Sequence, residues 1–114
     1  MSEEQLLADL RSDPDRIRFA DVLAAIDQGY RFTATAFDNG PVSNSAEQNQ
    51  GSCRVLAFAR LHQLDEPATL ALFGEHYRAV RDTPRGQDHQ NIRAFIAHGW
   101  QGVRFHGEPL ARPG

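Results

Sequence analysis

The sequence predicts a single α+β domain that is mostly helical, with about five helices packed against a small two-stranded antiparallel sheet. Three observations predict this fold class. Apolar residues recur at helical spacing in several segments, two shorter segments alternate between apolar and polar residues, and Gly, Pro, Asn and Asp separate the segments. The chain has 114 residues, of which 40% are hydrophobic, and this suits one domain over residues 1–114 with a single core.

Residues 1–18 are expected to form an N-terminal helix followed by a link. Ser2 is a suitable N-cap, two glutamates follow it in the first turn, and three leucines share one face before about Arg11. A second helix is expected over 19–28, and Gly29 ends it because glycine takes the left-handed conformation that commonly closes a helix. The short link between the two helices favours antiparallel packing.

Two segments show the alternation that is typical of strands. In residues 30–37 Phe and Ala alternate with Arg and Thr, and residues 100–106 alternate in a similar way. We expect residues 31–37 to pair with residues 102–106. The segment 38–41, Asp-Asn-Gly-Pro, predicts a tight turn because Asn and Gly tolerate positive φ.

Three more helices are expected in the second half of the chain. Residues 54–63 are apolar around most of the helical cylinder, which predicts a central, buried helix. Asp65 is a suitable N-cap for the next helix, whose apolar face would carry Leu70, Phe73, Gly74 and Tyr77. Asp88 is a suitable N-cap for a helix over 89–98, and residues 107–114 are expected to form a tail.

The composition excludes several classes of partner. The net charge of −3 offers no basic field for a nucleic acid, and no apolar run approaches the roughly 18 residues of a membrane span. The acidic N-terminus lacks the basic and apolar regions of a secretory signal peptide. The single cysteine cannot form an internal disulfide, which favours a reducing, cytoplasmic setting.

The most informative segment is residues 37–53, a long polar run rich in Asn and Gln. Long ordered loops are uncommon in small domains and are often functional. Because amides donate and accept hydrogen bonds, the run predicts a binding surface for a protein or a small molecule, formed by Asn39, Asn44, Gln48 and Asn49. In the alternative interpretation, these amides bond the segment's own backbone and keep it compact.

Cys53 and His89 are the candidate catalytic residues. Ser52 is a suitable helix N-cap, and a thiol at a helix start can have a lowered pKa and act as a nucleophile. His89 begins a predicted helix, which favours the neutral imidazole that a general base requires. In the alternative interpretation Cys53 is a small apolar core residue. Asn91 does not complete a triad, because residues two apart on a helix face different ways.

Trp100 is a further candidate binding residue, because glycines on both sides could leave its ring open for stacking. In the alternative interpretation the ring closes the core at a helix end. The five histidines show no spacing typical of a zinc site, so no metal and no cofactor are expected.

Several short motifs resemble a known family. They are Phe37-Asp38-Asn39-Gly40, Asn44, Gln48-Asn49-Gln50-Gly51-Ser52-Cys53, Phe73-Gly74-Glu75-His76-Tyr77-Arg78, Asp88-His89-Gln90-Asn91-Ile92-Arg93-Ala94-Phe95, Gly99-Trp100 and Val103-Arg104-Phe105. Together, in this order, they resemble the HopJ type III effector family, the HopPmaJ-like proteins, over roughly residues 19–110. The resemblance implies a small bacterial protein, resident in the bacterial cytoplasm or delivered to a host cell by type III secretion. It implies no reaction.

Two hypotheses of function follow. The first is an effector-like protein that acts by binding a protein or ligand through its Asn- and Gln-rich loop. The second is a small thiol-dependent enzyme that uses Cys53 with His89. The first is favoured because no catalytic motif accompanies Cys53.

Overall fold

The computed structural model describes residues 2–113, and within them it confirms a mostly helical α+β fold. The α-helices are α1 (Glu3–Ser12), α2 (Phe19–Gly29), α3 (Gln50–Leu61), α4 (Glu66–Ala71), α5 (Glu75–Asp82) and α6 (Gln90–His98). The short 3₁₀ turns are η1 (Pro14–Arg16) and η2 (Gly99–Gly102). The strands are β1 (Arg31–Phe32), β2 (Phe37–Asn39), β3 (Val42–Asn44), β4 (Val103–Phe105) and β5 (Leu110–Ala111).

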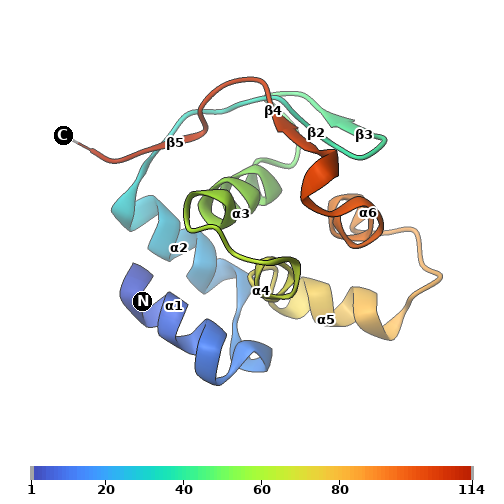
Figure 1. Ribbon diagram of the computed structural model, residues 1–114, viewed down its shortest axis with the longest axis horizontal. Coiled ribbons are helices and arrows are strands. Elements are labelled where there is room, and N and C mark those ends of the chain that lie inside the picture. Colours follow the sequence, from blue (N-terminus) through green and yellow to red (C-terminus); the bar gives the residue numbers. More distant parts are fainter. Residues whose placement is uncertain (1, 114) are drawn as a thin grey trace.

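The helix α3 lies at the centre of the molecule. α2 and α4 flank it, α1 packs against α2, and the strands run along one side of the helical layer (Figure 1). All residues of α3 from Val55 to Ala59 are buried, as is Cys53. The prediction of a central helix that is apolar on most sides is therefore confirmed. Phe37, Phe73 and Phe95 fill the core around it, together with Phe58 of α3 itself.

The strands form two small antiparallel sheets, and the predicted pairing is wrong in detail. β2 pairs with β4 and with β3, while β1 pairs separately with β5. The expected strand over 30–37 is interrupted because the amide of Thr35 donates to the Gln50 side chain instead of to a neighbouring strand. The predicted tail also forms a strand, since buried Leu110 in β5 pairs with Phe32 in β1.

The predicted fourth helix is two helices, which explains why residues 2–113 contain six α-helices instead of about five. The chain turns at Gly74, whose φ of 60° and ψ of −130° suit glycine alone. There its backbone passes so close to residues 17–19 that a Cβ atom would lie 2.7 Å from the Phe19 nitrogen. Tertiary packing against the start of α2 therefore divides α4 from α5.

Two of the predicted helix starts are also wrong. α3 begins at Gln50 with Asn49 as its N-cap, so Ser52 lies inside the first turn. α6 begins at Gln90 with His89 as its N-cap, because the Asp88 carboxylate accepts a 2.6 Å hydrogen bond from Arg93 instead.

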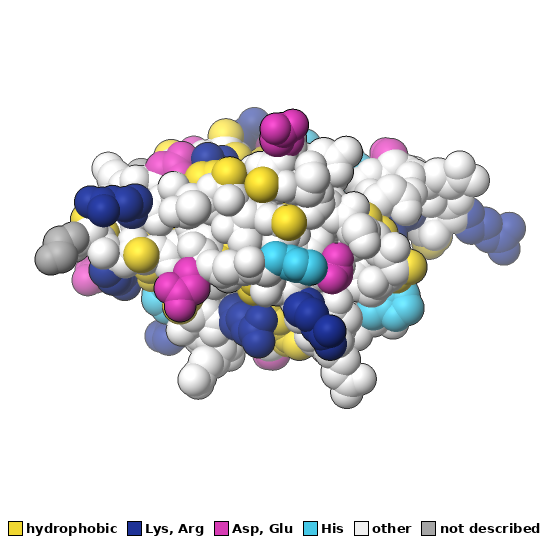
Figure 2. Space-filling model, turned by 90° about the horizontal axis from the view of Figure 1, so that it is seen from above, with side chains coloured by type: hydrophobic (Ala, Val, Ile, Leu, Met, Phe, Trp, Pro, Cys, Tyr) yellow, Lys and Arg dark blue, Asp and Glu magenta, His cyan; other side chains and the backbone are white. Residues whose placement is uncertain are grey.

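The outer face of the sheets carries charges of both signs. Figure 2 shows acidic, basic and histidine side chains interspersed over the strands, without a continuous field of one sign on this face. Among residues 2–113, no helix combines the length and the apolar character that crossing a membrane requires.

A partly buried carboxylate ties the two ends of the chain together. Glu3 Oε1 accepts a 2.5 Å hydrogen bond from the Tyr30 hydroxyl and lies 2.7 Å from His62 Nε2. Arg112 Nη2 donates to both carboxylate oxygens, and its guanidinium lies 4.2 Å above the Tyr30 ring. Burial, followed by the hydrogen bond to Glu3, raises the pKa of Tyr30 to about 12.

Glu3→Gln is expected to destabilise the fold in a pH-dependent way. Burial raises the pKa of the Glu3 carboxyl, but hydrogen bonds from Tyr30, Arg112 and His62 lower it by more, so this pKa lies below its ordinary value. Such a carboxyl stabilises the fold above its unfolded pKa and loses this contribution as the pH falls through its folded pKa. At neutral pH the loss should be about 1–2 kcal/mol in the free energy of unfolding.

Urea unfolding over a series of pH values checks this prediction. The exposed Glu4→Gln serves as the matched control and should change little. The difference between wild type and Glu3→Gln should shrink in acid. A difference that persists after the carboxyl is protonated would contradict the role given to its charge.

Candidate functional site

The Asn-rich segment is fixed by its own amides. Asn39 and Asn44 are buried, with exposed fractions of 0% and 4%. Asn39 Nδ2 donates to the carbonyl and the side-chain oxygens of Asn91, at 2.8 and 3.1 Å. Asn44 and Asn91 exchange two hydrogen bonds of 3.1–3.2 Å between their side chains. These amides join β2 and β3 to α6, and neither Asn39 nor Asn44 faces solvent.

The remainder of the segment is held in a similar way. Gln50 accepts a hydrogen bond from the Thr35 amide and donates to the carbonyls of Thr35, Ser45 and Gln48. Gln48 is exposed, and its side-chain oxygen accepts from the Ser45 amide. Asn49 is exposed, and its side chain donates a 2.7 Å hydrogen bond to Asn44 Oδ1. The loop is therefore an ordered element in which only Gln48 and Asn49, of the four predicted binding residues, reach the surface.

Cys53 lies in the core. Its exposed fraction is 0%, its Sγ lies 3.6 Å from the Thr35 carbonyl oxygen, and its amide is already bonded to the Asn49 carbonyl. Burial raises the pKa of the Cys53 thiol to about 11. The expected lowering of this pKa is wrong, because the helix begins before Cys53 and apolar surroundings disfavour a thiolate.

Cys53 is expected to react slowly with iodoacetamide in the native protein. Its thiolate fraction near neutral pH is small and the sulfur is covered, so the native rate should be about a hundredfold below that of the unfolded chain. Mass spectrometry of timed samples, with and without urea, measures both rates. Equal rates would show that the native thiol is open to reagents.

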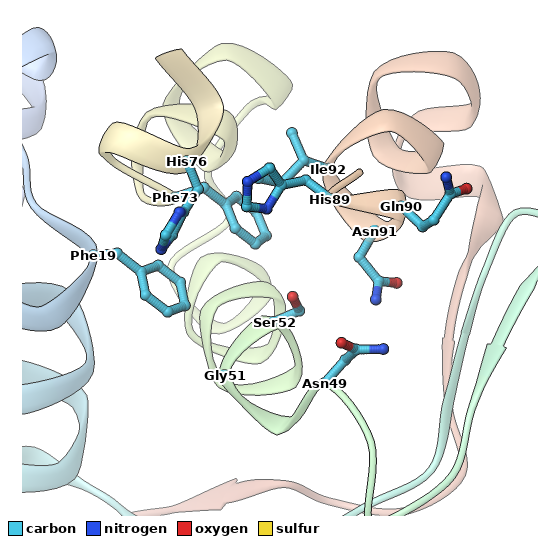
Figure 3. A pocket seen from close by; sticks show the side chains of 10 residues that line it. All are labelled: Phe19, Asn49, Gly51, Ser52, Phe73, His76, His89, Gln90, Asn91 and Ile92. Atoms are coloured by element: carbon cyan, nitrogen blue, oxygen red, sulfur yellow. The ribbon is translucent and has the colours of Figure 1, made fainter. Parts of the chain in front are cut away.

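An open pocket lies where the starts of three helices meet. Its volume is about 410 Å³. Its lining comes from the start of α2, the first turn of α3, the junction of α4 with α5, and the start of α6 (Figure 3). The lining residues are Phe19, Asn49, Gly51, Ser52, Phe73, His76, His89, Gln90, Asn91 and Ile92. We refer to this cavity as the α3–α6 pocket.

Aromatic rings form one wall of the α3–α6 pocket. Phe19 stacks on Phe73 with ring centroids 6.2 Å apart, and the His76 ring meets Phe19 edge-on at 4.9 Å. The rings of His76 and His89 lie 5.0 Å apart. Gly51 makes room for this wall, since a Cβ there would lie 3.1 Å from Cζ of Phe19.

Polar groups form the facing side. Asn49, Ser52 and Asn91 lie opposite the phenylalanines in Figure 3. The N-caps of α3 and α6, Asn49 and His89, have φ of 53° and 52°, and within the described chain neither side chain bonds the first turn of its helix. Backbone N–H groups at such starts are left for solvent or a ligand and carry partial positive charge.

The acidic residues nearest the pocket are engaged elsewhere. Glu75 Oε1 accepts a 2.7 Å hydrogen bond from the Phe19 amide, and this bond holds the pKa of Glu75 below its ordinary value. Hydrogen bonding from Arg93 lowers the pKa of Asp88. His89 Nε2 lies 3.9 Å from an Asp88 oxygen, beyond hydrogen-bond distance.

The two residues of the predicted catalytic pair lie in different surroundings. His89 lines the α3–α6 pocket, whereas Cys53 is sealed in the core and does not line it. Within residues 2–113, no cluster of three or more His, Cys, Asp or Glu side chains is arranged to hold a metal ion.

Trp100 lies in η2, away from the α3–α6 pocket. Its Nε1 donates a 3.1 Å hydrogen bond to the Leu64 carbonyl, and its ring packs edge-on against Phe95 with ring centroids 5.1 Å apart. The ring is half-buried and packs against the core, as in the core-closing interpretation.

Comparison with known proteins identifies the family. A family model described as HopJ type III effector protein matches residues 3–110, nearly the whole chain. The chain belongs to this family. A solved structure of a protein of unknown function, VPA0580, is similar to this HopJ chain with a TM-score of 0.95 and 44% sequence identity. The similarity covers 99% of the HopJ chain and 95% of the solved one. No curated protein matches.

Of the described residues that line the pocket in this HopJ chain, the sequence predicted Asn49 and His89 as site residues and missed the others. Phe19, Phe73 and His76 were not predicted to be site residues, and their meeting depends on the break at Gly74. The available signal was the Phe-Gly-Glu sequence at 73–75, in which a glycine interrupts a helical pattern.

Proposed function

We propose that this HopJ protein acts by binding a small ligand in the α3–α6 pocket. The observation that carries the proposal is the pocket itself, which joins an aromatic wall to polar side chains and open helix starts. Its volume of about 410 Å³ suits a small molecule. The ordered Asn- and Gln-rich segment supports two residues that line the pocket. Asn39 donates a hydrogen bond to the carbonyl of Asn91 in α6, and Asn44 accepts one from the side chain of Asn49.

Binding accounts for the arrangement better than thiol chemistry. A nucleophile must reach its substrate, and Cys53 is covered by the core, with a pKa raised to about 11. The histidines in the pocket therefore have no thiol to activate. His76 and His89 are instead placed to contact a bound molecule.

A fragment screen followed by NMR tests this proposal. The ¹H–¹⁵N spectrum of the labelled protein is recorded with each compound, and hits are expected to shift the amides of residues 49–52 and 89–92. Ser52→Leu, which fills the pocket from α3, should abolish these shifts. His98→Ala, on the exposed end of α6, should leave them unchanged and serves as the control.

Cys53→Ala separates binding from thiol chemistry. This variant should bind the same fragments as the wild type, because the thiol does not line the pocket. Shifts that gather elsewhere on the surface, or hits that Ser52→Leu does not affect, would overturn the proposal.

We further propose that the protein is delivered to a host cell, as the description of its family suggests. A reporter fused to residues 1–20 and expressed in a bacterium with an active type III apparatus should then appear in the host cytosol. An isogenic strain without the apparatus is the control. No transfer from the intact strain would contradict delivery, and would leave ligand binding unaffected.

A further inference from the structure

We infer that the ligand of the α3–α6 pocket is a small aromatic carboxylate, an inference that rests on the proposed binding function. The two halves of the pocket differ in chemistry, and each half matches one half of such a molecule. The aromatic lining and the hydrogen-bond donors support this assignment independently of one another.

The aromatic wall provides the surface for a ring. Phe19 and Phe73 stack with an interplanar angle of only 12°, and the His76 ring stands against Phe19 at 71°. A planar ligand ring can pack on such a wall by offset or edge contacts. Ile92 extends the apolar lining on the α6 side. A purely ionic ligand would leave this apolar wall without a matching partner.

The opposite side suits a carboxylate. Among the described residues that line the pocket none is Asp or Glu, while His89 presents an imidazole ring and Ser52 presents a hydroxyl donor. The neighbouring acids do not compete, because Glu75 is bonded to the Phe19 amide and Asp88 to Arg93. The side-chain donors on this side of the pocket therefore suit an anionic acceptor.

The geometry places the two halves of the ligand. Figure 3 shows Ser52, in the first turn of α3, with Phe19 and Phe73 on one side and Asn49 and Asn91 on the other. A ring packed against Phe19 would direct its carboxylate toward Ser52 and His89. The first-turn amides of α3 and α6 lie on the same side and add partial positive charge there.

NMR titration with four probes tests the inference. Benzoate carries both groups, benzyl alcohol carries the ring alone, and acetate and inorganic phosphate carry charge alone. We expect benzoate to bind at residues 49–52 and 89–92 at least about tenfold more tightly than any of the other three. Ser52→Ala and His89→Gln should weaken benzoate more than benzyl alcohol, whereas Phe19→Leu should weaken both.

Every other outcome contradicts a part of the inference or the whole of it. Equal affinity for benzyl alcohol would show that the carboxylate does not contribute to binding. Equal affinity for acetate or phosphate would show that the ring does not contribute. Failure of benzoate in a pocket that still binds neutral fragments would overturn the ligand class and leave the binding function intact. A pocket that binds neither benzoate nor any fragment would contradict both. Binding of benzoate elsewhere, unaffected by Ser52→Ala, would also overturn the inference.

Discussion

Replacing Gly74 with alanine is expected to destabilise the protein by about 3 kcal/mol or more, because the new side chain meets backbone atoms that cannot move independently. A Cβ at this position would lie 2.7 Å from the Phe19 nitrogen and 2.9 Å from the Ile17 carbonyl oxygen. The positive φ of 60° adds strain of its own. The start of α5 would have to move away from α2, and His76 and Phe19 would separate.

Urea unfolding gives the change in stability, and Gly29→Ala is the matched control. Gly29 is the last residue of α2, and a Cβ there would meet only the Arg112 side chain, at 3.5 Å. That variant should be neutral or slightly more stable, because alanine favours the helix. A Gly74→Ala protein as stable as the control would show that the junction between α4 and α5 adapts easily.

Asn91→Ala is expected to cost about 2–4 kcal/mol, because it removes hydrogen bonds from two buried amides. The substitution removes two hydrogen bonds with Asn44 and one with Asn39. Both partners are buried, so water cannot replace the lost contacts at no cost. β2 and β3 should loosen from α6 as a result.

Two measurements check this expectation. Urea unfolding should show the loss, and hydrogen exchange should quicken at the amides of β2 before the whole protein unfolds. The exposed neighbour Gln90→Ala is the control and should change stability by less than about 0.5 kcal/mol. Equal effects of the two substitutions would mean that the asparagine cluster contributes little.

Local patterns in the sequence were sufficient for much of the fold. Helical spacing located the helices α1, α2 and α6 within a few residues, and the apolar surface of α3 predicted its burial. The Asn39-Gly40 turn is present, with Gly40 at a φ of 58° between β2 and β3. These features depend on neighbours within a few positions, which a single sequence displays directly.

Long-range contacts decided the features that prediction missed. Gly74 interrupts a continuous helical pattern because its backbone lies against residues 17–19. The neighbouring hydrogen bond from the Phe19 amide to Glu75 joins residues that are 56 positions apart in the sequence. The strand pairs β1–β5 and β2–β4 also join distant segments. Only a folded chain shows which of several short alternating segments become neighbours.

The sequence by itself determined the family, the mostly helical α+β class and the turn at Asn39-Gly40. The tertiary structure alone decided what the Asn- and Gln-rich segment does. It buries Asn39 and Asn44 as supports, seals Cys53 in the core, and brings Phe19, His76 and His89 together around a pocket. The physical reason is that exposure, pKa and hydrogen bonding depend on which distant groups lie nearby, and local spacing does not specify those groups.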